Sequence, residues 1–322
     1  MNKKFTLASF FAGVGGIDMG FEQTGRVRTI YANEFDEYPA KTFEMNFQVK
    51  VDTRSICDVK PCEVPDADII CGGFPCQAFS VAGLQQGFED EKGRGTLFFE
   101  LLRIIRENYP RVIFLENVKN LLNHDDGRTF EIILDALEDS GYQCRYKVMN
   151  ASEFGNIPQN RERVYIVGFR EEEDFNKFHF PLAIPLKTKL SDIIDFENPV
   201  AEKYYYTEGK YKGDIYDKLK ESMDDSNTTY QWRRHYVRKN AQGVVPTLTA
   251  NMGGGGHNVP LVLTKHGIRK LTPRECFNAQ GFPSDFRLPT DMTESRIYKQ
   301  AGNSVCVSVI HRIAEAIVEA IS

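Results

Sequence analysis

Apolar and polar residues form two alternating patterns along the first half of the chain. Short apolar runs rich in β-branched and aromatic residues predict buried strands. Between them the apolar spacing is that of amphipathic helices. This alternation predicts an open α/β sheet, in which ligands bind beyond the carboxyl ends of the strands. The expected strands are 5–11, 29–35, 66–73, 111–118, 143–150 and 162–169, and the expected helices are 17–25, 37–47, 95–108 and 127–140.

The alternation stops near residue 170. The segment 171–265 is polar, aromatic and irregular, and it includes the glycine-rich stretch NMGGGGHN at 251–258. Helical periodicity returns at 305–321, where the apolar face needs a partner, so we expect this last helix to return to the first domain. At 322 residues, the length suits one large domain with one small one.

Composition is that of an ordinary soluble protein, with 41% hydrophobic and 26% charged residues. No apolar stretch reaches the roughly 20 residues that cross a bilayer, and the start of the chain runs into a glycine-rich turn. We therefore expect a cytoplasmic protein without membrane contact. The seven cysteines are odd in number and contain no CxxC pair or Cys/His cluster. This predicts neither a disulfide framework nor a metal site.

Charge is distributed unevenly along this chain, whose formal net charge is −5. Residues 226–274 contain no Asp or Glu, and Tyr230, Trp232 and Tyr236 are interleaved with the first of their positive charges. Such a stretch indicates a local footprint for phosphate, and the alternative is a solvated face. The positive residues are Arg233, Arg234, Arg238, Lys239, Lys265, Arg269, Lys270 and Arg274.

The sequence FAGVGG follows the first expected strand. Glycines there let a ligand approach the backbone closely, although the spacing is G-x-G-G and does not meet the dinucleotide fingerprint GxGxxG. A tight structural turn explains the glycines equally well. Glu34 lies about 20 residues further on, where a carboxylate can accept hydrogen bonds from ribose hydroxyls. Together the two features suggest an adenosine-containing cofactor.

A thiol, a carboxyl group and two arginines also lie at ends of expected strands. Cys76 follows a proline in GGFPCQAFS, and a thiolate there is a strong nucleophile if its pKa is lowered; the alternative is an inert buried cysteine. Glu116 follows an apolar run in the segment FLENV. Arg161 and Arg163 are two residues apart at the start of a strand, so both side chains can point to one face. We expect these groups to gather beside the cofactor turn.

The segments FAGVGG, GGFPCQAFS, ENV, QNRER, RKLTPRECFNAQGFP and GNSV, in this order, resemble the motif series of the DNA (cytosine-5)-methyltransferases of bacterial restriction-modification type. The resemblance implies a Rossmann-like S-adenosylmethionine-dependent methyltransferase domain with a small irregular target-recognition domain. The implied catalytic domain comprises residues 1–172 and 268–322, and the implied recognition domain comprises residues 173–267. The implied reaction is methyl transfer from S-adenosyl-L-methionine to C5 of a cytosine flipped out of duplex DNA, with covalent addition of the cysteine to C6.

The resemblance also implies roles for individual residues. Cys76 is the nucleophile, Glu116 holds the base, and Arg161 and Arg163 hold the base, the nucleophile loop and a phosphate. Gln77 and Ser80 meet the DNA backbone or the vacated stack, while Arg233, Arg234, Arg238, Gly254 and Gly255 fall in the segments expected to read DNA. The implied cofactor residues are Phe11, Gly13, Gly15, Gly16, Glu34, Ile56, Leu97, Asn303 and Val305.

Two positions depart from the family pattern, and both bear on cofactor affinity. The family often has an acidic residue at the position of Ser9. It also usually has an aspartate just before an isoleucine, where this chain has Ser55 before Ile56.

Three other functions are compatible with parts of the sequence. An enzyme of the same architecture acting on tRNA would share Cys76, Glu116 and the arginines, and a non-catalytic DNA-binding module would need only the basic segment. A nicotinamide dehydrogenase is disfavoured by the G-x-G-G spacing. For the favoured function we expect duplex DNA as the partner, a monomeric chain, and a separately encoded cognate restriction endonuclease that forms no stable complex with it.

Overall fold

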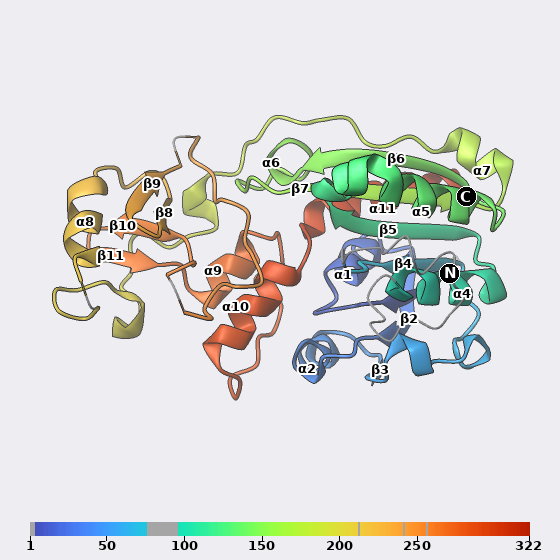
Figure 1. Ribbon diagram of the computed structural model, residues 1–322, viewed down its shortest axis with the longest axis horizontal. Helices are drawn as coiled ribbons and strands as arrows, with labels where there is room; N and C mark the ends of the chain where they lie inside the picture. The colour runs from blue at the N-terminus through green and yellow to red at the C-terminus, as the bar shows by residue number, and fades with distance from the viewer. Residues whose placement is uncertain (1–3, 76–95, 212, 241, 256) are drawn as a thin grey trace. The chain divides into compact units, whose positions relative to one another are not determined.

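The computed structural model describes residues 4–75, 96–211, 213–240, 242–255 and 257–322. Contacts divide the chain into two compact units (Figure 1). The first unit comprises residues 1–149, 162–181 and 310–322, and the second comprises residues 150–161 and 182–309. Segment 268–309 thus has its contacts in the second unit. The functional domain boundaries near residues 172 and 268 stay a prediction.

A seven-stranded sheet forms the centre of the first unit, in the order β3-β2-β1-β4-β5-β7-β6. The strands from β3 through β5 pair in parallel, whereas β7 pairs with β5 in antiparallel orientation. The six predicted strands are confirmed, and β3 is an additional two-residue strand. The bounds are β1 Phe5–Phe10, β2 Val27–Asn33, β3 Val51–Asp52, β4 Ile69–Gly72, β5 Val112–Val118, β6 Gln143–Asn150 and β7 Glu162–Phe169.

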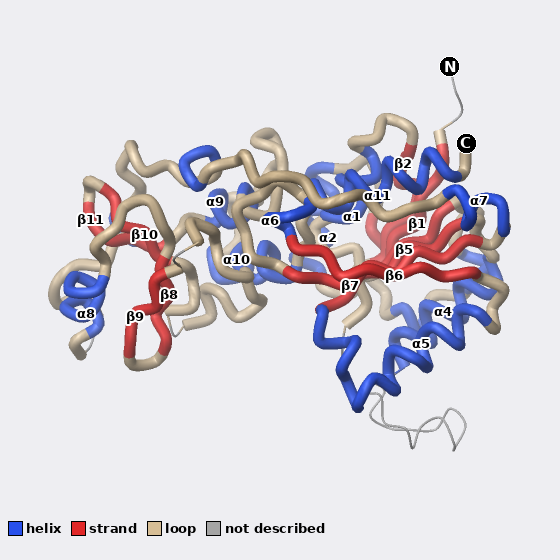
Figure 2. Tube along the Cα trace, turned by 90° about the horizontal axis from the view of Figure 1, so that it is seen from above, coloured by secondary structure: helices blue, strands red, loops and turns tan. Residues whose placement is uncertain are grey.

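Helices cover both faces of this sheet, α4 and α5 on one side and α1 and α11 on the other (Figure 2). The predicted helices are confirmed with slightly shorter bounds, which are α1 Gly16–Glu22, α2 Glu37–Asn46, α4 Thr96–Asn108, α5 Arg128–Glu138 and α11 Val307–Ala320. A short helix that the sequence did not predict, α7, spans Glu172–Lys177. The architecture is the expected α/β fold.

The main core lies between the sheet and helices α4 and α5. Alternate strand residues such as Phe10 and Leu115 face it, and α4 and α5 supply Leu101, Ile105 and Ile133 at helical spacing. On the opposite face, a Cβ added to Gly20 of α1 would lie 2.6 Å from the Ile310 side chain of α11. Only glycine permits this close helix approach, and the predicted return of the C-terminal helix to the first unit is confirmed.

The second unit contains a four-stranded antiparallel sheet in the order β11-β10-β8-β9. Each of its strands has only four residues, which is too short for a period-2 pattern to be recognised. The prediction that this segment is irregular was therefore wrong for these strands. A cluster that includes Tyr206, Leu219, Tyr230 and Leu261 forms its core. The bounds are β8 Tyr230–Arg233, β9 Tyr236–Lys239, β10 Leu261–Thr264, β11 Gly267–Lys270, α6 Ala151–Phe154, α8 Ile215–Ser222, α9 Pro273–Asn278 and α10 Glu294–Asn303.

None of the helices in the described ranges is long and apolar enough to cross a bilayer.

A buried carboxyl group joins β1, α1 and β2. Asp18 of α1 is fully buried and accepts hydrogen bonds from the Ser9 hydroxyl at 2.9 Å and the Thr29 hydroxyl at 3.2 Å. The family that the motifs resemble often has an acidic residue at the position of Ser9. In this chain the carboxyl group near that position is supplied by Asp18 of α1. Burial raises the pKa of Asp18 from 3.8 to about 7.

Asp18 makes stability depend on pH. Because its folded pKa lies above its unfolded pKa, the folded state binds more protons between pH 4 and 7, and stability falls as pH rises through this window. Replacement by Asn, which stays neutral, is expected to remove a slope of up to about 1.4 kcal/mol per pH unit. Melting temperatures of the wild type and Asp18→Asn from pH 5 to 8 test this. Parallel curves for the two proteins would contradict it.

Candidate functional site

Strands β1 and β4 of the first unit end in register at one edge of the sheet, beside Leu115 of β5, which continues to Val118. Phe10 of β1 is opposite Gly72 of β4, and Gly72 is opposite Leu115 of β5. The next residue of each segment therefore emerges at the same edge. Two of these segments are the predicted cofactor turn and the predicted nucleophile segment, and the third carries Glu116. The edge includes the point where strand order reverses, which is where open α/β sheets bind ligands.

Glu116 and Arg163 form an ion pair at this edge. Because β7 is antiparallel to β5, its start lies beside the end of β5, with Arg163 opposite Val118. Arg163 Nε lies 3.0 Å from Glu116 Oε1, and the two side chains are only 13% and 11% exposed. A Cβ added to Gly73 would lie 3.4 Å from Glu116 Oε2. The backbone at position 73, which leads to the predicted nucleophile, therefore runs close to this carboxylate.

Asn117 holds the backbone that leads to the predicted nucleophile. Its side chain is buried, and the amide nitrogen donates to the Phe74 carbonyl oxygen at 2.9 Å. Sequence reasoning gave Asn117 no role, although its place beside Glu116 was a signal. Cys76, Gln77 and Ser80 lie outside the described residues, so their roles stay predictions.

The predicted cofactor turn has left-handed backbone at Phe11, Gly13 and Gly15, with φ of 52°, 56° and 85°. Glu34 braces this turn, because its Oε2 accepts from the Gly13 N–H at 2.8 Å. Its Oε1 accepts from the Asp36 N–H at 2.9 Å. A carboxylate is an acceptor of the kind that ligand hydroxyls require. The structure thus brings together the turn and the acid that the sequence linked only by spacing, while Gly16 begins α1.

Phe35 is a residue of this region that sequence reasoning missed. It directly follows Glu34 and is 73% exposed. A large aromatic ring left in solvent beside the predicted cofactor turn offers a face for stacking a planar group. The signal available in the sequence was its place directly after the predicted ribose-binding acid, in the segment NEFD.

The other predicted cofactor residues divide between core and surface. Ile56 is buried, and Leu97 packs partly buried against the same core. Asn303 is exposed and Val305 is buried, and both belong to the second unit. Within the described ranges, His, Cys, Asp and Glu side chains form no group of three that could hold a metal ion.

Arg161 is 3% exposed, within the second unit. Its guanidinium donates to the main-chain carbonyl oxygens of Leu248 at 3.0 Å and Gly302 at 3.3 Å, and also to that of Ser304. These contacts tie segment 247–249 to segment 302–304. A Cβ added to Gly302 would lie 2.1 Å from the Thr249 carbonyl oxygen, so the two backbones are in direct contact. The described contacts give Arg161 a positioning role, and its catalytic role stays a prediction.

Three of the eight positive charges of segment 226–274 pair with acids from other parts of the second unit. Lys265 pairs with Glu197 at 2.7 Å, and the fully buried Arg269 forms two hydrogen bonds with Glu275. Lys239 pairs with Asp224 at 2.9 Å, which raises its pKa. The acids come from outside the segment. The number of positive residues in segment 226–274 is therefore larger than the number of positive charges available to bind an anion.

Two further cations of this segment lie partly buried. Burial lowers the pKa of Lys270, whose Nζ lies over the Tyr204 and Tyr298 rings. Burial also lowers the pKa of Arg274, which donates to the Phe286 carbonyl oxygen. The exposed arginines of the segment are the three on the β8–β9 hairpin, at positions 233, 234 and 238.

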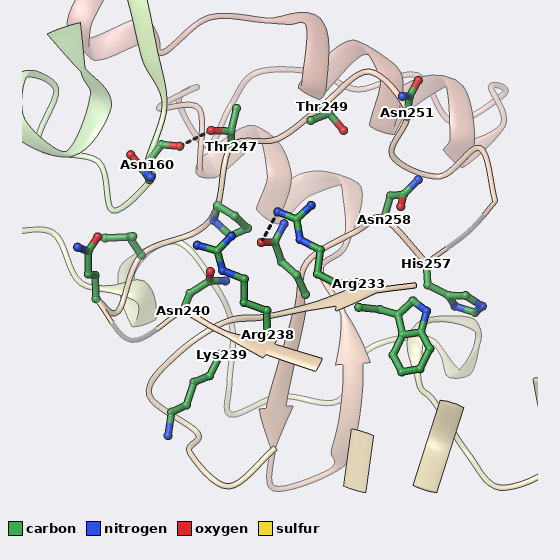
Figure 3. A pocket seen from close by; sticks show the side chains of 15 residues that line it. Asn160, Arg233, Arg238, Lys239, Asn240, Thr247, Thr249, Asn251, His257 and Asn258 are labelled. Atoms are coloured by element: carbon green, nitrogen blue, oxygen red, sulfur yellow. Dashed lines mark hydrogen bonds between the residues drawn. The ribbon is translucent and has the colours of Figure 1, made fainter. Parts of the chain in front are cut away.

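A cavity of about 690 Å³ opens beside this hairpin, within the second unit. Figure 3 shows Arg233 and Arg238 extending to the same side, toward Thr247, while Lys239 points away. The predicted residues Gly254 and Gly255 are exposed on the loop between the lining residues Asn251 and His257. The lining residues include no carboxylate, and they are Asn160, Gln231, Trp232, Arg233, Arg238, Lys239, Asn240, Gln242, Val244, Pro246, Thr247, Thr249, Asn251, His257 and Asn258.

Comparison with known proteins gives consistent matches over nearly the whole chain. The Type II methyltransferase M.Bsp6I of Bacillus sp. (strain RFL6) is 58% identical over 311 residues, 97% of this chain and 98% of that protein. The Type II methyltransferase M.HhaI of Haemophilus parahaemolyticus is 38% identical over 313 residues, 94% of this chain and 91% of that protein.

Among solved structures, the S. pombe Dnmt2 methyltransferase has a TM-score of 0.76 at 16% identity, covering 99% of this chain and all of that one. This likeness supports the fold alone. A family model described as C-5 cytosine-specific DNA methylase matches residues 5–319. The chain therefore belongs to the C-5 cytosine-specific DNA methylase family and is a DNA (cytosine-5)-methyltransferase.

Proposed function

We propose that the chain transfers a methyl group from S-adenosyl-L-methionine to C5 of a cytosine within a short specific sequence of duplex DNA. The observation that carries this proposal is the Glu116–Arg163 ion pair beside Gly73. It lies at the end of β5, next to the strand that leads to Cys76. The same edge carries the turn that Glu34 braces.

The chemistry explains why these groups are needed. Cytosine C5 is a poor nucleophile, and inside a duplex it is out of reach, so the base has to leave the stack at a cost of a few kcal/mol. Addition of the Cys76 thiolate to C6 makes C5 electron-rich enough to be methylated. Loss of the C5 proton then expels the thiolate and restores the aromatic ring.

Glu116 is proposed to donate a proton to N3 of the flipped base and to accept a hydrogen bond from its exocyclic amine, through the carboxyl group whose Oε2 lies near Gly73. Arg163 fixes the other oxygen and compensates the carboxylate charge, so Glu116 keeps one orientation. Asn117 keeps the backbone before Cys76 in place through the Phe74 carbonyl. Pre-positioning of this kind lowers the entropic part of the barrier.

The groups around the cofactor turn fit an adenosine-containing cofactor. Glu34 is a carboxylate acceptor suited to ribose hydroxyls, the turn presents its backbone, and the exposed Phe35 ring offers a stacking face for adenine. When bound, S-adenosyl-L-methionine supplies an electrophilic methyl group.

DNA is proposed to bind at the cavity beside the β8–β9 hairpin. Its lining combines two arginines with amides and hydroxyls and no carboxylate, which suits a polyanion whose bases carry hydrogen-bonding edges. The exposed glycines Gly254 and Gly255 permit close backbone approach. The similar proteins are named Type II methyltransferases. We therefore propose that the chain is the modification enzyme of a restriction-modification system, acting in the cytoplasm as a monomer beside a separately encoded endonuclease.

The proposed function is tested by tritiated-methyl transfer to duplex DNA and to bulk tRNA, followed by base-resolution mapping. 5-Methylcytosine in one short duplex context is the expected result. Label in tRNA alone would assign the chain to the runner-up function, and absence of label with intact DNA binding would indicate a non-catalytic module.

Replacing Cys76 with Ser is expected to abolish methyl transfer while leaving binding of duplex DNA and S-adenosylhomocysteine intact, because a hydroxyl is a far weaker nucleophile than a thiolate. Tritium incorporation and gel-shift titration measure the two properties. Cys57→Ser, which alters an exposed thiol, is the matched control and should stay active. Near-normal turnover by the Cys76 variant would refute the mechanism.

Replacing Glu116 with Gln is expected to lower kcat about 100-fold or more, because the amide can neither protonate N3 nor pair with Arg163 as an ion. Affinity for S-adenosylhomocysteine should not change. Glu162→Gln, an exposed neighbour that pairs with Lys119, is the matched control. Single-turnover rates separate the two variants, and a loss of only a few-fold for Glu116→Gln would speak against its role.

Replacing Arg233 and Arg234 together with Ala is expected to weaken DNA binding and to flatten the dependence of the binding constant on salt concentration. The double variant Lys203→Ala and Lys265→Ala removes two exposed cations that are already paired with acids, and should leave the slope nearly unchanged. Titrations at several salt concentrations measure both. Equal slopes for the wild type and the arginine variant would mean that the hairpin is a solvated face.

A further inference from the structure

The three exposed arginines of the β8–β9 hairpin differ in their surroundings. Arg233 and Arg238 lie on strands and line the cavity, whereas Arg234 lies on the connecting turn with a left-handed φ of 54° and is not among the lining residues. Side chains on paired strands are held more firmly than side chains on a turn. The hairpin therefore presents two positioned arginines and one peripheral arginine.

Strand register places both positioned arginines on one face. Gln231 is directly opposite Arg238, and Arg233 is two residues from Gln231, so all three side chains share a side of the ribbon. The intervening Trp232 and its partner Val237 point to the other side and pack against the small core. A one-residue slip would expose the tryptophan, so burial of this apolar pair fixes the register.

Gln231 orients one of the two arginines. The Arg233 Nη2 donates to the Gln231 Oε1 at 3.4 Å, a bond drawn in Figure 3. A guanidinium has five N–H donors, so this contact leaves the remaining donors of the fork to face the cavity. Gln231 as a whole is half-buried, and the hydrogen bond itself is exposed. Pre-orientation of this kind favours planar, two-point recognition over contact with a mobile charge.

The opposite wall of the cavity is uncharged and suited to hydrogen bonding. Thr247, Thr249 and Asn251 line it, and the Thr247 hydroxyl donates to the Asn160 carbonyl oxygen, which anchors the wall. A two-stranded ribbon is of a size that enters the major groove of DNA. A phosphate can be bound by a simple point charge, such as that of a lysine. Two planar guanidiniums beside amides and hydroxyls are better suited to the donors and acceptors on base edges.

We propose that Arg233 and Arg238 each read one guanine of the recognised sequence through its O6 and N7 acceptors, that Gln231 positions Arg233, and that Arg234 contacts a phosphate. Arginine bidentate to guanine is the commonest specific base contact in the major groove. The inference rests on the proposed function, because it requires that the chain methylates duplex DNA. The sequence alone could not tell which of these arginines contact bases and which contact phosphates. The proposal assigns Arg233 and Arg238 to bases and Arg234 to a phosphate.

The test is methylation of a random-sequence duplex library, with base-resolution mapping of the products. Arg233→Lys and Arg238→Lys keep the charge but lose the fork, so each should lose discrimination for guanine at one position of the motif, and at different positions. The expected loss is about tenfold or more, the value of one bidentate contact. Gln231→Ala should weaken discrimination at the Arg233 position only.

Arg234 supplies the matched control on the same hairpin. Arg234→Lys should keep the full motif, while Arg234→Ala should lower the salt slope by about one without changing the motif. The inference is wrong if both strand variants keep the complete motif and lose only rate, or if Arg234→Lys loses a position. A wild type that methylates no duplex would instead contradict the proposed function.

A second measurement needs no variant. In the mapped site, each guanine is replaced in turn by 7-deazaguanine, which keeps Watson–Crick pairing but lacks the N7 acceptor. Wild-type methylation should drop about tenfold at the two positions that the lysine variants identify. Full activity on both substituted duplexes would overturn the inference.

Discussion

The antiparallel pairing of β7 with β5 is the constraint on which the catalytic edge depends. It brings the start of one strand to the end of the other, so Arg163 Nε comes to lie 3.0 Å from Glu116 Oε1. Both side chains are nearly buried, and a carboxylate in that position without a cation would suffer a large desolvation penalty. A buried ion pair adds little net stability, so its value here is that it fixes a carboxylate in one orientation beside Gly73.

Two buried polar side chains hold backbone segments rather than other side chains. Asn117 donates to the Phe74 carbonyl in the first unit, and Arg161 donates to the carbonyls of Leu248 and Gly302 in the second. Main-chain carbonyls of irregular segments lack ladder partners and are costly to bury unpaired. Each side chain thus satisfies such carbonyls and fixes the segment that carries them. In both cases the fixed segment adjoins residues with a proposed role in binding or chemistry.

Ion pairs with carboxylates determine which cations of the second unit remain available to a ligand. Eight cations follow one another in a segment without acids, yet Lys239, Lys265 and Arg269 are neutralised by carboxylates from other segments. The positive charge that stays exposed is concentrated on one hairpin, in a protein whose formal net charge is −5. Acidic surfaces elsewhere repel a polyanion, so confinement of positive charge to the hairpin directs where DNA is expected to dock.

The sequence by itself determined six of the seven strands of the large sheet and the helices that cover it, because each of these is long enough for its apolar period to show, whereas β3 has only two residues. It also determined the family, through motifs whose order and residue types are specific. The strands of the small sheet, four residues each, carry too little pattern to be seen. Only the tertiary structure decided that Arg163 meets Glu116, that Asp18 faces Ser9, and which cations stay unpaired. These outcomes depend on strand direction and on partners distant in the chain, and a local pattern contains neither.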